Sequence, residues 1–350
     1  MSKAAKPSVI PSRANALFAV QSVVEKQSII EKLPDLFDKP LHGVQLLRDG
    51  FAQKNSGCQL FLQLRVGRNR KQRTTKPLWS LKDEGDRYSS LVELFCADQV
   101  DTLTIDCEGK GSFEYTDQSV AICWEENGTG PEHYFQSLGL GLWLEKQGVP
   151  CIHANALAID DFAIGILAPS QTGKTTLTAA LLHAGLAMMS DDMLALYQAD
   201  NEWRVYPSWP IFRVWPDSAK MYAETDIETL PRVHSRFDKR IIDLETCSGL
   251  KSCQSSRPLK QLYLLDRQST TESSQRNSVT IEAVSPAHAL VHLLQNSMLG
   301  GAYSALGVEQ GRLKKLAALL EMVPLKKITY NSGMELLPEV CKTLLADAKA

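Results

Sequence analysis

The sequence predicts an α/β protein in which a smaller β-rich domain precedes a domain built around a phosphate-binding loop. Three observations carry this prediction. Apolar and polar residues alternate in several short runs between residues 44 and 124, as they do in half-buried strands. After residue 134, short apolar runs alternate with segments of helical periodicity. At one strand-to-helix junction, residues 168–175 have the sequence Ala-Pro-Ser-Gln-Thr-Gly-Lys-Thr.

Composition indicates a globular protein and excludes some classes of partner. The chain has 350 residues, of which 44% are hydrophobic and 22% are charged, so it can bury a large core. Lys and Arg number 38 against 40 Asp and Glu, and no basic block indicates a nucleic-acid partner. No run reaches the roughly 20 apolar residues that span a bilayer, and the first residues lead into no apolar signal core. We therefore expect a cytoplasmic protein with no membrane partner.

The first 134 residues are predicted to form a short segment and then the β-rich domain. Residues 1–40 contain one stretch, 15–33, whose apolar spacing predicts an amphipathic helix. Residues 41–134 hold the strand signals. The turn cluster at 125–131 breaks their alternation, and we place the domain boundary just after it. The strands predicted in this domain are 59–66, 102–105, 112–115 and 120–124.

Residues 135–350 are predicted to form the second, α/β domain. Its apolar runs 151–159 and 162–167 are joined by two aspartates, which predicts a hairpin. The second run leads directly into the loop at 168–175, and a polar stretch at 268–278 predicts another loop. The other predicted elements are helices over 134–146, 177–183, 286–294 and 312–322, and strands over 186–189, 262–265 and 279–284.

The loop at 168–175 has the residue types that bind a nucleotide phosphate. Such a loop needs backbone N–H groups at a helix N-terminus, a lysine for the β and γ phosphates, and a hydroxyl for magnesium. The first glycine of the motif is replaced by Ala168, where a left-handed backbone would cost about 1 kcal/mol. A chance Gly-Lys-Thr is the alternative, against which the strand-loop-helix context argues. The candidate binding residues are Ala168, Ser170, Gln171, Thr172, Gly173, Lys174, Thr175 and Thr176, and the predicted ligands are ATP and Mg²⁺.

An aspartate pair and a histidine flank this loop. Asp191 and Asp192 follow a predicted strand, where phosphoryl-transfer sites place the acids that bind the metal and orient the acceptor. Consecutive strand residues point to opposite faces, so at most one faces the phosphate unless the chain turns there. A plain turn is the other interpretation of the pair. His153 lies in an apolar run, and both a buried core residue and an active-site group fit that position.

The spacing of His153, Lys174 and the pair Asp191-Asp192 resembles the catalytic domain of the HPr kinase/phosphorylase family. In that family a histidine precedes the loop lysine, and an aspartate pair follows it, at the same distances as here. The resemblance covers residues 135–350. Residues 213–217, Arg-Val-Trp-Pro-Asp, further resemble a stretch of HPr-kinase-related proteins of unassigned substrate.

The resemblance implies a P-loop kinase fold akin to phosphoenolpyruvate carboxykinase and transfer from ATP to a seryl hydroxyl. It implies that Lys174 binds phosphate, that Asp192 is the acid/base group with Asp191 beside it, and that His153 is the active-site histidine. Thr175 and Asp191 are the candidate metal ligands. The phosphate acceptor, a protein or a small molecule, is unidentified, and a homo-oligomer is compatible with the resemblance.

Two features depart from the family pattern. The glutamate that assists the metal in the family has no counterpart in the stretch 211–214. The catalytic arginine of the family has no clear match, and Arg240 is the candidate for it. A solvated basic turn is the other interpretation of Arg240 and its neighbours.

Two functions from different classes follow. The first is an ATP- and Mg²⁺-dependent kinase in which Asp192 accepts the proton of a hydroxyl acceptor. The second is a nucleotide-binding regulatory or assembly module without transfer, which Ala168 and the missing glutamate favour. The intact paired acids argue against the module. A carboxykinase acting on oxaloacetate ranks last, because the substrate-binding arginines that it needs are not found in the sequence.

Overall fold

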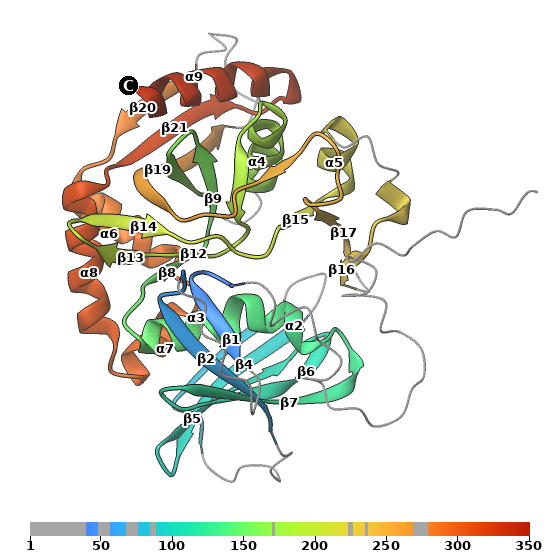
Figure 1. Cartoon of the computed structure of the whole chain (residues 1–350), viewed down its shortest axis with the longest axis vertical. Coiled ribbons are helices and arrows are strands. Elements are labelled where there is room, and N and C mark those ends of the chain that lie inside the picture. Colours follow the sequence, from blue (N-terminus) through green and yellow to red (C-terminus); the bar gives the residue numbers. More distant parts are fainter. Residues whose placement is uncertain are drawn as a thin grey trace, which may run out of the picture.

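The computed structural model shows a mixed α/β structure with several sheets, which confirms the predicted α/β class (Figure 1). The helix expected over 15–33, the loop residues Ser170 and Gln171, and residues 269–278 of the expected polar loop lie outside the residues that the structure describes. The described residues are 40–47, 57–67, 76–84, 89–169, 172–222, 227–234, 237–268 and 279–350.

The first sheet is seven-stranded, in the order β1-β2-β7-β6-β5-β4-β3. β1 pairs with β2, and β2 with β7, in parallel, whereas the other neighbours are antiparallel. The four predicted strands are present. The predicted break at 125 is wrong, because β7 continues to Gly128, which pairs with Gly109. The strands are β1 Val44–Leu47, β2 Leu60–Val66, β3 Trp79–Glu84, β4 Ser89–Ala97, β5 Val100–Asp106, β6 Gly109–Tyr115 and β7 Ser119–Gly128.

A helical segment connects this sheet to the rest of the chain (Figure 1). It consists of α2 Pro131–Tyr134, the π-helix η2 Phe135–Gly139 and α3 Leu140–Lys146. The ring of Phe135 lies 5.9 Å from that of Phe113 in β6. One hydrophobic cluster includes Phe113, Trp143 of α3 and Tyr303 from the C-terminal part. The predicted boundary at residue 135 therefore falls inside a shared core, and the division into two domains stays a prediction.

The second sheet has nine strands in the order β13-β14-β19-β10-β9-β11-β18, with β21 beside β19 and β20 beside β21. Two smaller sheets join β8 to β12 and β15 to β17 and β16. The strands of the second sheet are β9 Ala154–Ile159, β10 Phe162–Leu167, β11 Ala187–Ser190, β13 Tyr197–Ala199, β14 Glu202–Val205, β18 Lys251–Ser252, β19 Arg257–Gln268, β20 Thr280–Ala283 and β21 Leu325–Asn331. Those of the smaller sheets are β8 Cys151–Ile152, β12 Leu194–Ala195, β15 Ile211–Val214, β16 Arg232–His234 and β17 Phe237–Asp243.

Strand direction places the predicted site at one edge of this sheet. β9 pairs antiparallel with both β10 and β11, so β10 and β11 point the same way. The hairpin predicted for β9 and β10 is confirmed, with Phe162 opposite Ile159. The loop after β10, the aspartate pair after β11 and the start of β9 consequently lie at the same edge.

Helices cover both faces of the second sheet (Figure 1). α4 Lys174–His183 and α9 Leu337–Lys349 pack on one face, in a cluster with Leu157 and Ile164. α6 Pro286–Gln295 and α8 Glu309–Met322 pack on the other, in a cluster with Ala163 and Leu262. The short helices are α5 Pro216–Tyr222, η3 Ile227–Thr229, α7 Gly300–Ala305 and η4 Met334–Leu336.

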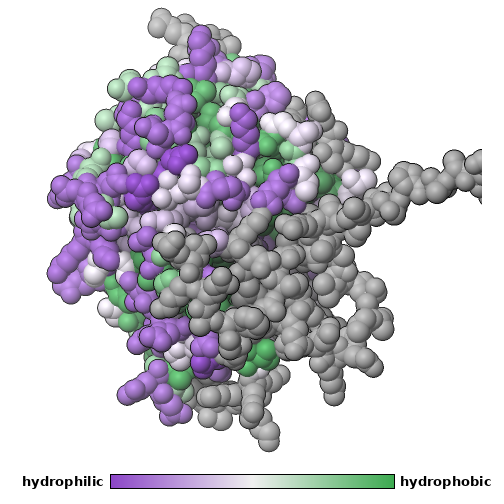
Figure 2. All heavy atoms as spheres, viewed as in Figure 1, coloured by the Kyte–Doolittle hydropathy of each residue, from purple (hydrophilic) through white to green (hydrophobic). Residues whose placement is uncertain are grey.

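Two observations concern the apolar character of the visible surface and of the described helices. Hydrophilic residues cover much of the described surface over α8 and α9 in Figure 2. Among the described helices, none has both the length and the apolar character needed to cross a bilayer.

Candidate functional site

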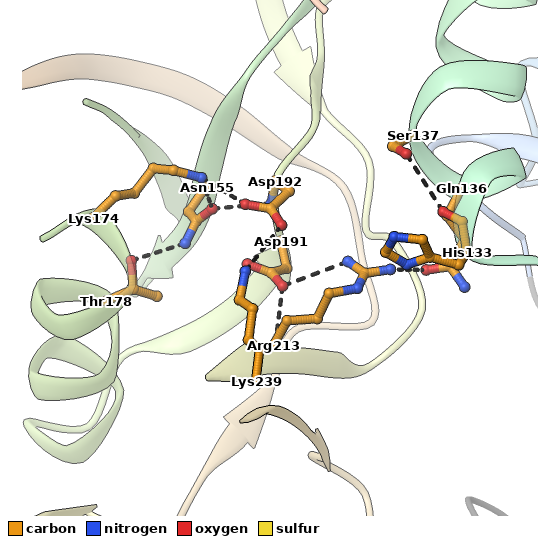
Figure 3. Close-up of polar contacts among 10 residues, drawn as sticks. All are labelled: His133, Gln136, Ser137, Asn155, Lys174, Thr178, Asp191, Asp192, Arg213 and Lys239. Carbon is orange, nitrogen blue, oxygen red and sulfur yellow. Dashed lines mark hydrogen bonds and ion pairs between the residues drawn. The ribbon is translucent and has the colours of Figure 1, made fainter. Parts of the chain in front are cut away.

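Lys174, the first residue of α4, lies at the centre of the predicted site. Its Nζ donates to Asn155 Oδ1 at 3.0 Å and to Asp192 Oδ1 at 2.7 Å (Figure 3). An ammonium group has three N–H donors, so these two hydrogen bonds use two of them. The side chain of Lys174 is buried. The lysine and one aspartate predicted from the sequence are therefore in direct contact.

Asn155 of β9 organises this contact and was missed from the sequence. Its Oδ1 also accepts a hydrogen bond from the backbone N–H of Asp192 at 3.0 Å, and its Nδ2 donates to Thr178 Oγ1 of α4 at 3.0 Å. The side chain of Asn155 is completely buried, and burial of an amide is favourable only when its polar atoms are bonded. The signal was available, since Asn155 is the one polar residue in the apolar run 154–159.

The chain turns at Asp192, which has a φ of +65°. This left-handed conformation is one that Asp adopts more readily than most residues. The alternation of a regular strand ends there, so Asp191 and Asp192 both direct their carboxylates into the site (Figure 3). Besides Lys174, Asp192 faces Lys239 of β17, whose Nζ lies 3.6 Å from Asp192 Oδ2.

Asp191 is buried in a second set of contacts. Its Oδ2 accepts the backbone N–H of Arg213 at 2.9 Å and lies 3.5 Å from Nη1 of the same residue. Nη2 of Arg213 in turn donates to Gln136 Oε1 of η2 at 2.7 Å. Asp191 Oδ1 and Ser190 Oγ are buried without a hydrogen-bond partner in the described part of the chain.

The two carboxylates have opposite pKa shifts. Burial raises the pKa of Asp191, and the neighbouring charge of Asp192 adds to that effect. Burial also acts to raise the pKa of Asp192, but the ammonium groups of Lys174 and Lys239 outweigh it, so this pKa lies well below its ordinary value. Asp192 is therefore an ionised group held between two cations.

His153 lies at the same edge, immediately after β8. Its backbone N–H donates to the carbonyl of Asn296 at 2.6 Å. Burial, reinforced by the positive charge of Lys174, lowers the pKa of His153 to about 4. The imidazole is consequently neutral near pH 7. His153 is mostly buried, as a core residue would be, and it also lies close to the charged groups of Lys174 and Asp192. Its role in an active site therefore stays a prediction.

A buried ion pair holds β8, the strand that ends just before His153. Nε of Arg312 donates to Glu145 Oε1 at 2.9 Å, and the same oxygen accepts the backbone N–H of Cys151 at 2.7 Å. Arg312 Nη2 also donates to the carbonyl of Cys151 at 3.2 Å. These contacts tie β8 to α3 and α8, and thereby set the position of His153.

The described residues at the start of α4 could bind an anion. Gly173 has a φ of +100°, a conformation that favours glycine. No acidic residue lies in the first turn of α4, and no side chain among the described residues caps it, so its N-terminal N–H groups and the positive end of its dipole can attract an anion. The strain anticipated at Ala168 is not found, because its φ is not positive.

The threonines of the loop make local contacts. Thr172 Oγ1 donates to the carbonyl of Pro169 at 2.7 Å. Thr176 Oγ1 shares a hydrogen bond of 3.0 Å with Ser218 Oγ of α5. Thr175, the candidate metal-side hydroxyl, lies in the first turn of α4 and is partly buried. Thr175 therefore occupies the hydroxyl position that follows the lysine in the motif.

No contact among the described residues joins Arg240 to Asp191 or Asp192. Its Nη2 lies 3.1 Å from Glu228 Oε2, and its Nη1 donates to the carbonyl of Leu230 at 3.3 Å. Neighbouring residues of a strand point to opposite sides, so when Arg240 faces Glu228 its neighbour Lys239 faces Asp192. Lys239 is the cation that the sequence reasoning missed.

These residues fit a magnesium ion that arrives with a nucleotide better than a resident ion. Within the described ranges, no group of three or more His, Cys, Asp or Glu side chains is arranged to hold a metal. Magnesium in nucleotide sites takes one or two carboxylates and completes its shell with phosphate oxygens and water. The buried, unpartnered Oδ1 of Asp191 and the hydroxyl of Thr175 match such a partial set.

A cavity of about 700 Å³ adjoins the loop. Its lining includes His153, Ala168 and Pro169 on the site side and Asp266 and Lys327 on the far side. The cavity therefore extends from the loop after β10, beyond the carboxyl end of that strand, across the C-terminal part of β19 to Lys327 in β21. Open α/β sheets usually bind ligands beyond the carboxyl ends of their strands.

No family model matches the chain, and no curated protein matches it. Among solved structures, the Hpr(Ser) kinase/phosphatase from Coxiella burnetii is similar over 57% of this chain and 92% of that chain. The sequence identity is 14% and the TM-score is 0.31. This likeness is distant.

Proposed function

We propose that the chain is an ATP- and Mg²⁺-dependent kinase that transfers the γ-phosphoryl group to a hydroxyl, on a Ser or Thr of a protein or on a small molecule. The observation that carries the proposal is the convergence of Lys174, Asn155 and Asp192 at the N-terminus of α4. It combines a phosphate-binding helix end, a buried lysine and an ionised carboxylate within hydrogen-bonding distance.

Each of these side chains has a separate task in transfer. Lys174 keeps its bond to Asn155 and directs an N–H to the phosphate oxygens, while Lys239 stays as the counter-ion of Asp192. Asp192 accepts the proton of the acceptor hydroxyl. The acceptor oxygen then bonds to the γ-phosphorus, the bond from that phosphorus to the β–γ bridging oxygen breaks, and ADP leaves.

The remaining groups hold charge in place. Thr175 and Asp191 would hold Mg²⁺, which neutralises charge on the phosphate oxygens. Arg213 fixes the carboxylate of Asp191 through its backbone N–H and its guanidinium. His153, neutral near pH 7, can donate or accept a hydrogen bond without adding a charge.

One observation favours a second function, a nucleotide-binding module without transfer. Both carboxylate oxygens of Asp192 lie beside ammonium groups, and the low pKa that results makes this carboxylate a weak base. In phosphoryl transfer, positioning and charge stabilisation dominate, and an ionised carboxylate that accepts a hydrogen bond from the acceptor hydroxyl contributes through its position as well as its basicity. We therefore place the kinase first.

Phosphate transfer and nucleotide affinity, measured together, test the proposal. The chain is incubated with γ-labelled ATP, Mg²⁺ and lysate of the source cell, and the labelled product is followed. Asp192→Asn should leave ATP affinity nearly unchanged and reduce transfer by roughly 10²- to 10⁴-fold. Asn tolerates the left-handed backbone of this position, so the fold should survive. Lys174→Ala should reduce affinity and transfer together.

Asp161→Asn is the matched control, because Asp161 lies exposed in the hairpin turn away from the site. It should transfer phosphate at the wild-type rate. If the wild type and Asp192→Asn bind ATP equally well and neither labels any acceptor, the module becomes the better assignment. If the wild type binds no nucleotide, the phosphate-binding interpretation of the loop is wrong.

A further inference from the structure

The cavity beside the loop has the size and position of a ligand site, and apart from His153 and Ala168 its lining residues have no part in the proposed transfer. Its volume of about 700 Å³ lies within the range of roughly 300–1,000 Å³ that is usual for small-molecule sites. Its walls come from the residues that follow β10, from the C-terminal part of β19, from Lys327 within β21 and from the C-terminal end of α6. Rigid elements rather than long loops therefore shape the described walls.

Strand order separates this cavity from the acidic pair. β9 and β11, which carry Asn155 and precede Asp192, lie on one side of β10. β19 and β21, which carry Asp266 and Lys327, lie on the other side. A ligand with its phosphates at the N-terminus of α4 would direct its acceptor-facing end to β11. Its other end would then lie over β19 and β21.

The charges of the lining favour an uncharged group. Lys327 Nζ lies 3.5 Å from Asp266 Oδ2, so these opposite charges largely cancel. α6 presents its C-terminal end to the cavity through His292, Gln295 and Asn296. The carbonyl end of a helix has a negative partial charge, which repels phosphate and attracts N–H and O–H donors. The N-terminus of α4 has the opposite polarity and suits the phosphates.

The remaining lining suits a flat, partly apolar group with several donors. Ala168, Pro169 and Leu264 supply apolar surface, and the amides of Gln295 and Asn296 supply polar atoms. Apolar walls with a few polar groups that fix orientation are usual for sites that bind a heterocycle. A nucleoside has this combination, with an apolar ring face, N–H donors and sugar hydroxyls.

We propose that this cavity binds the nucleoside of the phosphate donor while the N-terminus of α4 binds its phosphates. The proposal rests on the function proposed above. It adds that the uncharged nucleoside of the donor lies in the cavity between β10, β19, β21 and α6. The competing occupant is the phosphate acceptor, which the test below separates from the nucleoside.

A pair of tryptophan substitutions on α6 tests the assignment. Gln295→Trp adds bulk at an exposed residue of the cavity lining, and Val291→Trp adds the same bulk one turn earlier, at a residue that is 48% exposed and does not line it. Calorimetric titration then gives the affinity of each variant for ATP with Mg²⁺ and for tripolyphosphate. Gln295→Trp should lose at least tenfold in affinity for ATP and stay within twofold of the wild type for tripolyphosphate. Val291→Trp should match the wild type for both.

Three outcomes overturn the proposal. Equal losses for ATP and tripolyphosphate mean that the cavity is not separate from the phosphate site. Unchanged ATP affinity with a raised KM for the acceptor assigns the cavity to the acceptor and leaves the kinase function standing. If the wild-type chain binds neither probe, the proposed function fails and the nucleoside site fails with it.

A measurement on the unmodified chain keeps the proposal testable if Gln295→Trp does not fold. Adenosine has no phosphate, so it should bind in the presence of saturating tripolyphosphate with an affinity within about threefold of that without it. Chemical-shift changes at the imidazoles of His153 and His292, which both line the cavity, report its binding. Exclusion of adenosine by tripolyphosphate, or no change at millimolar adenosine, overturns the assignment.

Discussion

The side chain of Gln136 accepts a hydrogen bond of 2.7 Å from Nη2 of Arg213. Gln136 belongs to the π-helical segment that packs on the first sheet, and Arg213 holds Asp191. A π-helical turn is rare and is often found at functional sites. One buried side chain therefore connects the β-rich part of the chain with the acidic pair.

Gln136→Ala should destabilise the protein, because it leaves a buried guanidinium N–H without an acceptor. A buried unsatisfied donor costs about 1–3 kcal/mol, and urea denaturation should show a loss of that size in the free energy of unfolding. Gln147→Ala, which removes an exposed hydrogen bond to the carbonyl of Asp117, is the control and should change stability by less than about 0.5 kcal/mol. Equal effects of the two variants would contradict the buried connection.

Two glycines that flank α4 allow the effect of backbone strain on ATP affinity to be distinguished from the effect of a change in the binding loop. Gly173 precedes the helix with a φ of +100°, and Gly185 follows it with a φ of +101°. Alanine at either position should cost about 1–2 kcal/mol of stability, because both require a left-handed backbone. ATP affinity, measured by thermal shift, should fall only in Gly173→Ala. A comparable loss of affinity in Gly185→Ala would show that strain anywhere in α4 disturbs the site.

Lys239 and Arg240 should respond to substitution in opposite ways. Lys239→Met removes the ammonium beside Asp192 and should reduce phosphate transfer by tenfold or more, a loss of about 1.4 kcal/mol in transition-state stabilisation, with little change in melting temperature. Arg240→Met removes a buried guanidinium with its hydrogen bond to the carbonyl of Leu230 and its ion pair with the exposed Glu228, so it should lower the melting temperature and leave transfer per folded molecule unchanged. The reverse pattern would favour Arg240 over Lys239 as the catalytic cation.

The free energy of unfolding of the wild-type protein should decrease at acid pH, in part because of His153. Its pKa in the folded state is about 4, below the ordinary value of 6.5. Between these values the unfolded chain binds a proton that the folded chain does not bind, so the free energy of unfolding decreases as the pH falls. Denaturant titrations from about pH 7 to about pH 4.5 should therefore show a shallower decrease for His153→Gln than for the wild type. His288→Gln, at an exposed position of α6, should keep the wild-type slope. Parallel slopes for all three proteins would contradict the shifted pKa.

Local patterns in the sequence were enough to predict the loop, the hairpin and the acidic pair. Each depends on neighbours in the chain: the apolar runs of β9 and β10, the Gly-Lys-Thr at the start of α4, and the aspartates that follow β11. The predicted strands of the first sheet alternate clearly. β3 shows no such alternation, because nearly all of its side chains are exposed at the edge of the sheet. It was therefore not predicted.

The partners of the loop could not be predicted in the same way. Lys239 reaches Asp192 only because β17 pairs with β15, and Gln136 reaches Arg213 from a helix far away in the sequence. Such contacts depend on long-range pairing, which no local pattern encodes. The role of Arg240 stays a prediction, but the cation that lies beside Asp192 is its neighbour Lys239, which the sequence analysis did not single out because the alternation of β17 was not recognised.

The faces of β9 have a consequence for how the site is assembled. Ala154, Ala156 and Ala158 face the cluster of α6 and α8, whereas Asn155 between them contacts Thr178 of α4. Shifting a strand by one residue exchanges its faces, so a slip in this hairpin would replace the amide with a methyl group. Both faces are buried, so solvent exposure would not penalise the error strongly. The two-residue turn after Ile159, at the opposite end of β9, therefore helps to fix this register. An insertion of one residue there that shifts β9 would remove the contact between Asn155 and Lys174, although no residue beside Lys174 has been substituted.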